Sequence, residues 1–175
     1  TEIAVMSLGG VVYSKSLRVA GDAMDAAIIS YMRKKFNLLI GESTAEKIKK
    51  EIGTAIPTSN NIFLMKGRDI RTGTPKEISL TEEDACEALM PILSQMMAAI
   101  KEALENTPPE LSADLVDMGL VLTGGGALLK NIDKLISKDT GLPVTIADNP
   151  LECVALGTGK ALENEELFST MLSEY

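Results

Sequence analysis

The most informative stretch of the sequence is Val121-Leu122-Thr123-Gly124-Gly125-Gly126-Ala127, in which an apolar strand leads into three consecutive glycines. Glycine has no Cβ atom, so a ligand can approach the backbone of such a turn closely. The unpaired N–H groups at the start of a helix also favour an anion. The stretch therefore indicates a phosphate or nucleotide site. The helix is predicted from apolar residues that recur at helical spacing behind the glycines, at Leu128, Leu129, Ile132, Leu135 and Ile136.

The composition is that of a globular protein, with 45% hydrophobic residues among 175 and a formal net charge of -8. This charge argues against a general nucleic-acid binder, which needs clustered cations. The local basic run Arg33-Lys34-Lys35 is interpreted as a solvated helix face. No apolar run approaches the roughly 18 residues that a membrane span needs. We expect a water-soluble α/β protein that does not bind nucleic acid.

Histidine is absent from the sequence, which excludes a Ser-His-Asp triad and histidine metal sites. The two cysteines, Cys86 and Cys153, lie far apart and are too few for a zinc cage. We expect both to be reduced thiols. No catalytic residue and no metal ligand is therefore assigned.

Local signals divide the chain into alternating strands and helices. Gly9-Gly10 favours a tight hairpin turn, and Asp22 is expected to cap the helix that follows. Ser43 and Glu46 fit a capping box, and Asn149 is expected to cap the last helix. In chain order we expect strands at 3–8 and 11–19, helices at 22–37 and 43–53, and strands at 62–65 and 76–80 with a bulge at 67–69. A long helix from 81, kinked at Pro91, and a short helix to 118 are expected next. They are followed by a strand to 122, a helix to 141, a strand at 144–147, a helix from 149, and a frayed tail after 163.

This order predicts an α/β domain that carries a second, inserted lobe. Residues 1–36 and 119–175 are expected to form the larger lobe around one sheet. Residues 37–118 are expected to form a smaller α+β lobe inserted into it. The chain begins in a strand pattern at Thr1 without a methionine, so we expect a piece of a larger protein.

The triple glycine fits neither common phosphate motif. A dinucleotide fingerprint starting at Gly124 requires glycine where Leu129 stands. A P-loop requires a Gly-Lys-Ser/Thr sequence after its first glycine, and none follows here. A nucleotide-contacting turn and a purely structural turn therefore both stay open, with equal weight.

A second candidate group lies on the helix that starts near Ser43. Glu46 and Lys49 are three residues apart and share one face, so a carboxylate and an ammonium could reach one ligand together. A carboxylate that accepts from sugar hydroxyls beside a lysine suits a ribose. An exposed ion pair of about 0.2–0.5 kcal/mol is the favoured alternative.

The sequence as a whole resembles the MreB family of bacterial actin homologues within the actin-like ATPases. The glycine stretch continued to Leu129 is similar to the adenosine motif of those ATPases. The resemblance covers essentially all of the chain and implies an actin-like, ribonuclease H-like fold in which the two lobes are subdomains IIA and IIB. The other stretches that carry it are Thr1–Val5, Gly21-Asp22 with Asp25, Leu38–Glu42, Thr44–Lys49, Thr107–Leu111 and Gly159–Leu162.

The resemblance implies ATP or ADP as the ligand, with Mg²⁺ in the intact protein. Adenine would lie between the glycine turn and the helix that carries Glu46. Glu46 would accept from the ribose hydroxyls and Lys49 would lie along the adenosine edge. The full set of expected binding residues is Thr44, Ala45, Glu46, Lys47, Lys49, Gly124, Gly125, Gly126 and Ala127.

Several features of the family have no counterpart in these residues. They are the phosphate loops, the metal-coordinating aspartate, the water-positioning carboxylate and the membrane-inserting element. The intact protein is expected to be a slow ATPase that polymerises head to tail into paired, membrane-associated protofilaments. It would direct cell-wall synthesis and rod shape from the cytoplasmic face of the membrane, with a membrane-bridging partner on subdomain IIA. The alternatives are a sugar kinase or Hsp70-like ATPase, and a fragment that serves only as an interaction module.

Overall fold

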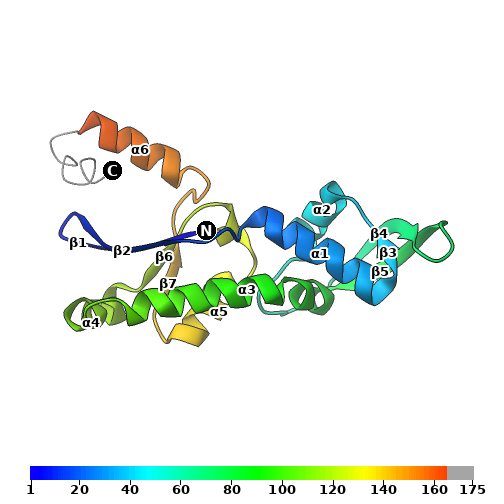
Figure 1. The fold of residues 1–175 in the computed structure, drawn as a ribbon, viewed down its shortest axis with the longest axis horizontal. Helices are drawn as coiled ribbons and strands as arrows, with labels where there is room; N and C mark the ends of the chain where they lie inside the picture. The colour runs from blue at the N-terminus through cyan, green and yellow to red at the C-terminus, as the bar shows by residue number, and fades with distance from the viewer. Residues whose placement is uncertain (165–175) are drawn as a thin grey trace. The chain divides into compact units, whose positions relative to one another are not determined.

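The computed structural model describes residues 1–164 and has an α/β architecture (Figure 1). In chain order its elements are β1 (Glu2–Ser7), β2 (Gly10–Ser16), α1 (Gly21–Phe36), β3 (Leu38–Leu39), α2 (Glu42–Ile52), β4 (Ile62–Asp69), β5 (Pro75–Thr81), α3 (Glu82–Glu105), α4 (Pro109–Met118), β6 (Leu120–Leu122), the 3₁₀ turn η1 (Gly125–Leu128), α5 (Ile132–Thr140), β7 (Val144–Ile146) and α6 (Cys153–Glu163). The frayed tail that the sequence predicts after residue 163 lies almost entirely outside the described residues.

The chain divides into two compact units. Unit 1 contains residues 1–18, 96–128 and 136 onward, and unit 2 contains residues 19–95 and 129–135. The units are defined by contacts within this chain and do not test the lobes that the sequence predicts. The lobe boundaries at 37 and 118 come from the sequence and stay a prediction.

Unit 2 is built on a three-stranded antiparallel sheet in the order β3-β4-β5. Helices α1 and α2 pack on each other and on this sheet (Figure 1). Residues at helical spacing turn inward, as the sequence predicts: Met24, Ile28 and Met32 on α1 and Ala45, Ile48 and Ile52 on α2 are buried. They form the core of unit 2 with Met65, Leu80, Leu89 and Leu93.

The bulge predicted at 67–69 is wrong. The β4–β5 register runs without a shift from Ile62 to Arg68, and Arg68 and Asp69 pair with β3 without a shift. Gly67 instead allows β3 to approach β4. A Cβ atom built at Gly67 would lie 2.7 Å from the carbonyl oxygen of Leu39 and 2.8 Å from Cγ of Leu38. Glycine is needed here because β3 lies close to β4, and not because β4 contains an extra, bulged residue.

Helix α3 begins with a reciprocal cap. The Thr81 hydroxyl accepts from the backbone N–H of Asp84 at 3.2 Å, and the Asp84 carboxylate accepts from the N–H of Thr81 at 3.0 Å. The sequence correctly places the helix start at Thr81. Pro91 lies inside the helix, which continues to Glu105.

The carboxylate of Glu82 anchors the loop that precedes β4. One of its oxygens accepts from the backbone N–H groups of Thr58 and Ser59, at 3.1 and 3.0 Å. The other accepts from the Ser59 hydroxyl at 2.8 Å. These donors favour the ionised form, so the pKa of Glu82 is lowered in the folded state.

We therefore expect Glu82→Gln to destabilise the chain by about 1–3 kcal/mol at pH 7, since an amide cannot accept all of these bonds. The folded pKa lies below the unfolded value of about 4.3. The contribution of Glu82 is thus present above pH 4.3 and is lost as the pH falls through the folded pKa. Urea unfolding between pH 3 and 7 measures both effects. Glu83→Gln, at the exposed neighbour, should change neither; equal effects of the two variants would contradict the role of Glu82.

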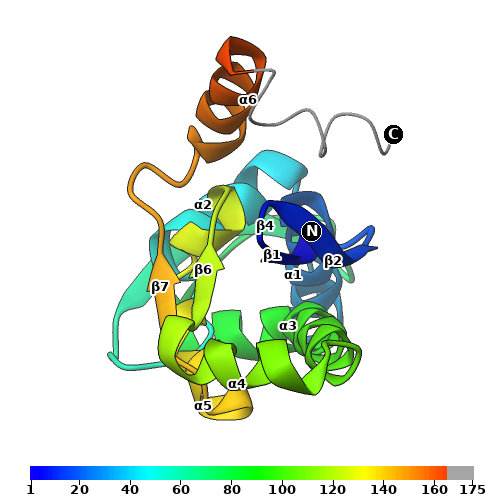
Figure 2. The ribbon, with the colours of Figure 1, turned by 90° about the vertical axis from the view of Figure 1, so that its left-hand side faces the viewer.

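Unit 1 contains two separate strand pairs. β1 and β2 form an antiparallel hairpin across Leu8 and Gly9, with an irregularity between Val5 and Met6. β6 and β7 are parallel, and η1 and α5 lie in the connection between them (Figure 2). The single sheet that the sequence predicts for the larger lobe is not formed among the described residues, because no ladder joins the two pairs.

Three predicted caps are wrong. α1 begins at Gly21 with Ala20 as its cap, so Asp22 lies in the first turn. α2 begins at Glu42 with Gly41 as its cap, because the Gly41 carbonyl accepts from the N–H groups of Thr44 and Ala45 at 3.1 Å. α6 begins only at Cys153, after a turn closed by a bond from Glu152 N–H to Asn149. Within residues 1–164, no helix combines the length and apolar character needed to cross a membrane.

Candidate functional site

The glycine turn of unit 1 exposes bare backbone. Gly124 has φ +77°, which favours glycine, and its N–H donates to the carbonyl of Pro150 at 2.7 Å. A Cβ atom built at Gly124 or at Gly126 would have no described atom within 4 Å. At Gly125 the nearest atom is Cδ2 of Leu151 at 3.4 Å. Among residues 1–164, the space beside Gly124 and Gly126 is therefore open where a side chain would begin.

The continuous helix predicted behind the glycines is wrong. The turn forms η1, which ends at Leu128 and buries Ala127, and α5 starts only at Ile132. Between them the carbonyl of Lys130 accepts from the N–H of Ala55 at 2.8 Å, in an isolated parallel bridge. An extended bridge residue cannot continue a helix, so the apolar positions at helical spacing belong to two short elements.

The candidate residues on α2 lie in unit 2 and differ in exposure. Ala45 is fully buried and Thr44 is half-buried, whereas Glu46 and Lys47 are exposed. The Lys47 ammonium lies 5.8 Å from the centre of the Phe63 ring. Glu46 and Lys47 are thus the members of the set whose polar groups are most accessible.

The structure does not pair Glu46 with Lys49. Glu46 forms an ion pair with Lys50 at 2.7 Å, one helical turn away, and this bond lowers the pKa of the Glu46 carboxyl. Lys49 points toward α1, where its ammonium contacts a carboxylate oxygen of Asp25 at 2.8 Å and the Gly21 carbonyl at 3.2 Å. The spacing of three residues predicted a shared face, but side chains on α1 decide where Lys49 points.

A polar cluster that the sequence did not predict fixes the segment after the glycine turn to the C-terminal end of α2, within unit 2. The fully buried Thr54 hydroxyl contacts the carbonyls of Ile56 and Lys130 at 2.6 and 3.1 Å. The Asn131 amide donates to the Ile56 carbonyl at 2.9 Å, and the Lys130 ammonium to the Glu51 carbonyl at 2.7 Å. Asn131 has φ +60°, a conformation that asparagine tolerates better than most residues. An asparagine at this position is the one feature of the sequence that could have indicated a turn here.

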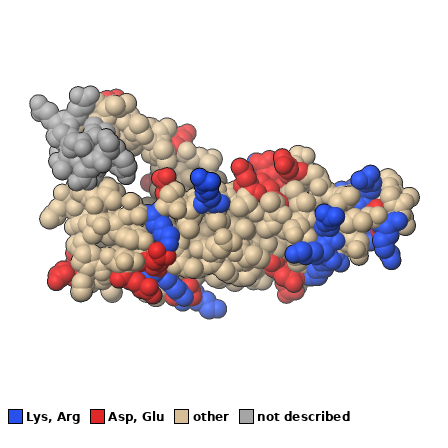
Figure 3. Space-filling view, in the orientation of Figure 1, with Lys and Arg blue, Asp and Glu red and all other residues tan. Residues whose placement is uncertain are grey.

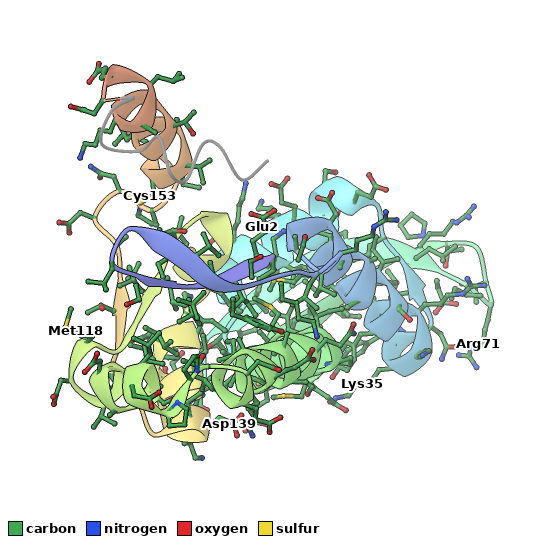
Figure 4. The ribbon with its side chains drawn as sticks, turned by 60° about the vertical axis from the view of Figure 1, so that its left-hand side comes forward. Glu2, Lys35, Arg71, Met118, Asp139 and Cys153 are labelled. Carbon is green, nitrogen blue, oxygen red and sulfur yellow. The ribbon has the colours of Figure 1, made fainter. Side chains whose placement is uncertain are left out.

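Cationic side chains gather at the end of unit 2 formed by the β4–β5 hairpin and the end of α1 (Figure 3). Arg71 projects from the hairpin, and Lys35 lies at the end of α1 (Figure 4). Lys35 is held by Asp84 at 3.0 Å and Glu87 at 2.7 Å. Arg33 and Lys34 are exposed, as expected for a solvated helix end. Among residues 1–164, no group of three or more acidic or cysteine side chains is arranged to hold a metal ion.

Residues 1–170 match the family model of MreB/Mbl proteins. The chain belongs to the MreB/Mbl family. The cell shape-determining protein MreB of Escherichia coli K12 is 50% identical over 164 residues, which are 93% of this chain and 47% of that protein. The cell shape-determining protein Mbl of Bacillus subtilis is 44% identical over 165 residues, or 94% of this chain and 50% of that protein. The chain thus spans about half the length of these MreB/Mbl relatives.

Solved MreB structures share the fold. MreB5 of Spiroplasma citri bound to ADP has a TM-score of 0.89 at 39% identity and covers 93% of this chain, which corresponds to 50% of that protein. The AMPPNP-bound form has a TM-score of 0.90 at 36% identity and covers 99% of this chain and 52% of that protein. A MamK double helical filament matches at 17% identity with a TM-score of 0.66, which shows the fold alone. The predicted actin-like α/β fold is confirmed.

The nine predicted binding residues therefore divide between the units. Gly124 to Ala127 belong to unit 1, and the five residues of α2 belong to unit 2. Locally, the glycine turn has the open backbone that the sequence predicts, whereas on α2 Glu46 and Lys49 have different partners. Their joint role in binding a nucleotide stays a prediction.

Proposed function

We propose that this chain is the adenosine-contacting part of an ATP-binding, actin-like cytoskeletal protein that polymerises into filaments and determines cell shape. The observation that carries the proposal is the open backbone of the glycine turn, in a chain that matches an ADP-bound MreB structure with a TM-score of 0.89. Its relatives named cell shape-determining proteins support the same role. A sugar kinase or Hsp70-like role has no such support.

In this proposal the backbone of Gly124, Gly125 and Gly126 lies against adenine and the α-phosphate. On α2, the exposed Glu46 accepts from the ribose hydroxyls, and Thr44, Ala45 and Lys47 shape the surface around it. Lys49 lies along the adenosine edge. Each contact suits the local chemistry: a face without Cβ atoms for a flat ring, and an exposed carboxylate for two hydroxyl donors.

Hydrolysis and membrane attachment belong, in this proposal, to groups outside these residues. Mg²⁺ would accompany the nucleotide through its phosphates, without a ligand from this chain. The protein would act at the cytoplasmic face of the cell membrane, directing cell-wall synthesis and rod shape, and a membrane-bridging cell-shape protein would dock on the larger lobe. Self-association would occur head to tail and between paired protofilaments.

Sedimentation of the protein at the full length of its relatives tests this function. We expect it to pellet in a nucleotide- and salt-dependent manner, with ATP giving more polymer than a nucleotide-free sample. The salt dependence follows because charged surfaces between subunits are screened as ionic strength rises. A protein that stays soluble with every nucleotide would contradict the filament proposal and favour a kinase-like ATPase. Binding without polymerisation would leave adenosine recognition standing and remove the cytoskeletal role.

A further inference from the structure

An ion pair joins the first part of α1 to the last part of α2. The Lys49 ammonium donates to Oδ2 of Asp25 at 2.8 Å and to the backbone carbonyl of Gly21 at 3.2 Å. The two charged side chains are only 17% and 15% exposed. A Cβ atom at position 21 would lie 3.4 Å from the ammonium, so glycine leaves room for this contact. All three residues belong to unit 2.

Fold stability alone is a poor explanation for this pair. Oδ1 of Asp25 is the one buried side-chain oxygen or nitrogen within residues 1–164 that has no hydrogen-bond partner. Burying a charged pair with an unsatisfied oxygen costs desolvation free energy, and well-packed apolar side chains often stabilise such a position equally well. A buried carboxylate oxygen without a hydrogen-bond partner therefore points to a role other than stability.

The hydrogen-bond donors of Lys49 indicate what this role is. An ammonium has three N–H donors, and two of those on Lys49 are used by Asp25 and Gly21. Glu46, which lies on the same helix, forms its ion pair with Lys50 and not with Lys49. The ion pair therefore fixes the position of a partly desolvated cation. Within the described residues, its third N–H donor makes no hydrogen bond.

We propose that Asp25 is a positioning residue, which holds Lys49 so that its third N–H donates to an acceptor of the bound adenosine, a ribose hydroxyl or an adenine ring nitrogen. The inference rests on the proposed nucleotide-binding function and adds a residue to it. Asp25 itself touches Lys49 and not the ligand. Without Asp25 the lysine would sample several rotamers, and binding would have to order it again.

The test compares ADP affinity and thermal stability in the protein at the full length of its relatives. Asp25→Asn keeps the size of the side chain and removes its charge, and we expect it to weaken ADP binding about five- to tenfold. Asp22→Asn is the matched control, because Asp22 is exposed and lies in the same turn of α1. The control should bind ADP as the unmodified protein does.

A charge swap separates positioning from mere stabilisation. Asp25→Lys combined with Lys49→Asp restores an ion pair between α1 and α2 but moves the cation to α1. We expect this double variant to regain thermal stability relative to Asp25→Lys alone, while ADP affinity stays low. Full affinity in Asp25→Asn or in the swapped protein would overturn the positioning role. Absence of saturable ADP binding in the unmodified protein is a different result, which overturns the proposed function itself.

Discussion

Replacing Gly126 with valine is expected to weaken ADP binding about tenfold or more while the melting temperature changes by no more than about 2 °C. Within this chain the new side chain meets open space, because no described atom lies within 4 Å of a Cβ atom at this position. It would, however, occupy the face on which the nucleotide is proposed to lie. The substitution thus removes room for the ligand without removing a contact of the fold.

Isothermal titration with ADP and a thermal melt of the same full-length variant measure the two quantities. Gly157→Val is the matched control, since Gly157 also has no neighbour within 4 Å of a built Cβ atom and lies in α6, away in sequence from every candidate residue. If both variants bind ADP equally well, the glycine turn is a structural turn and the proposed contact is wrong.

Gly119→Ala is expected to destabilise the chain by about 2–4 kcal/mol, the largest effect on stability that we predict for a single added methyl group. Gly119 has φ +71°, and an added Cβ atom would overlap the carbonyl oxygen of Pro143 and lie 3.0 Å from its carbonyl carbon. The adjacent N–H of Leu120 donates to that same carbonyl at 2.8 Å, which is where β6 joins β7. The methyl group would therefore part the two strands that hold the glycine turn.

Gly73→Ala is the control for a positive φ without a close neighbour. Gly73 has φ +72°, and a Cβ atom there would have no neighbour within 4 Å. Only the backbone strain of about 1–2 kcal/mol applies to it. Urea unfolding of both variants gives the difference, and an equal loss in the two would show that the close approach to Pro143 carries no energetic weight.

The sequence predicts much of the architecture because local chemistry and global fold agree there. The Thr81 cap, the buried faces of α1 and α2 and the end of α5 before Gly141 follow from spacing and from residue type. Gly141, with φ +75°, is the left-handed glycine expected after a helix. The resemblance to the MreB family identified the actin-like fold that the solved structures confirm.

Where the prediction failed, a partner distant in sequence decided the local structure. Lys130 leaves the helical conformation because it forms a bridge with Thr54, in which its carbonyl accepts from the N–H of Ala55, more than 70 residues earlier. Lys49 pairs with Asp25 rather than with Glu46, because α1 packs on α2. Spacing within one helix cannot reveal these two contacts, since each depends on which elements become neighbours. The cap of α2 is a local exception, because the Gly41 carbonyl accepts from the N–H groups of Thr44 and Ala45.

A nuclear magnetic resonance titration of the 175-residue chain with ADP tests the central claim most directly, because it reports every backbone amide at once. We expect weak but saturable shifts of the Gly124–Ala127 amides and of the Thr44–Lys49 amides, with one common dissociation constant. Inorganic phosphate at the same concentration should not reproduce the shifts on α2, since those residues are proposed to contact the nucleoside. Shifts confined to other residues, or none at millimolar ADP, would contradict the assignment of this chain as an adenosine-contacting part of an MreB/Mbl protein.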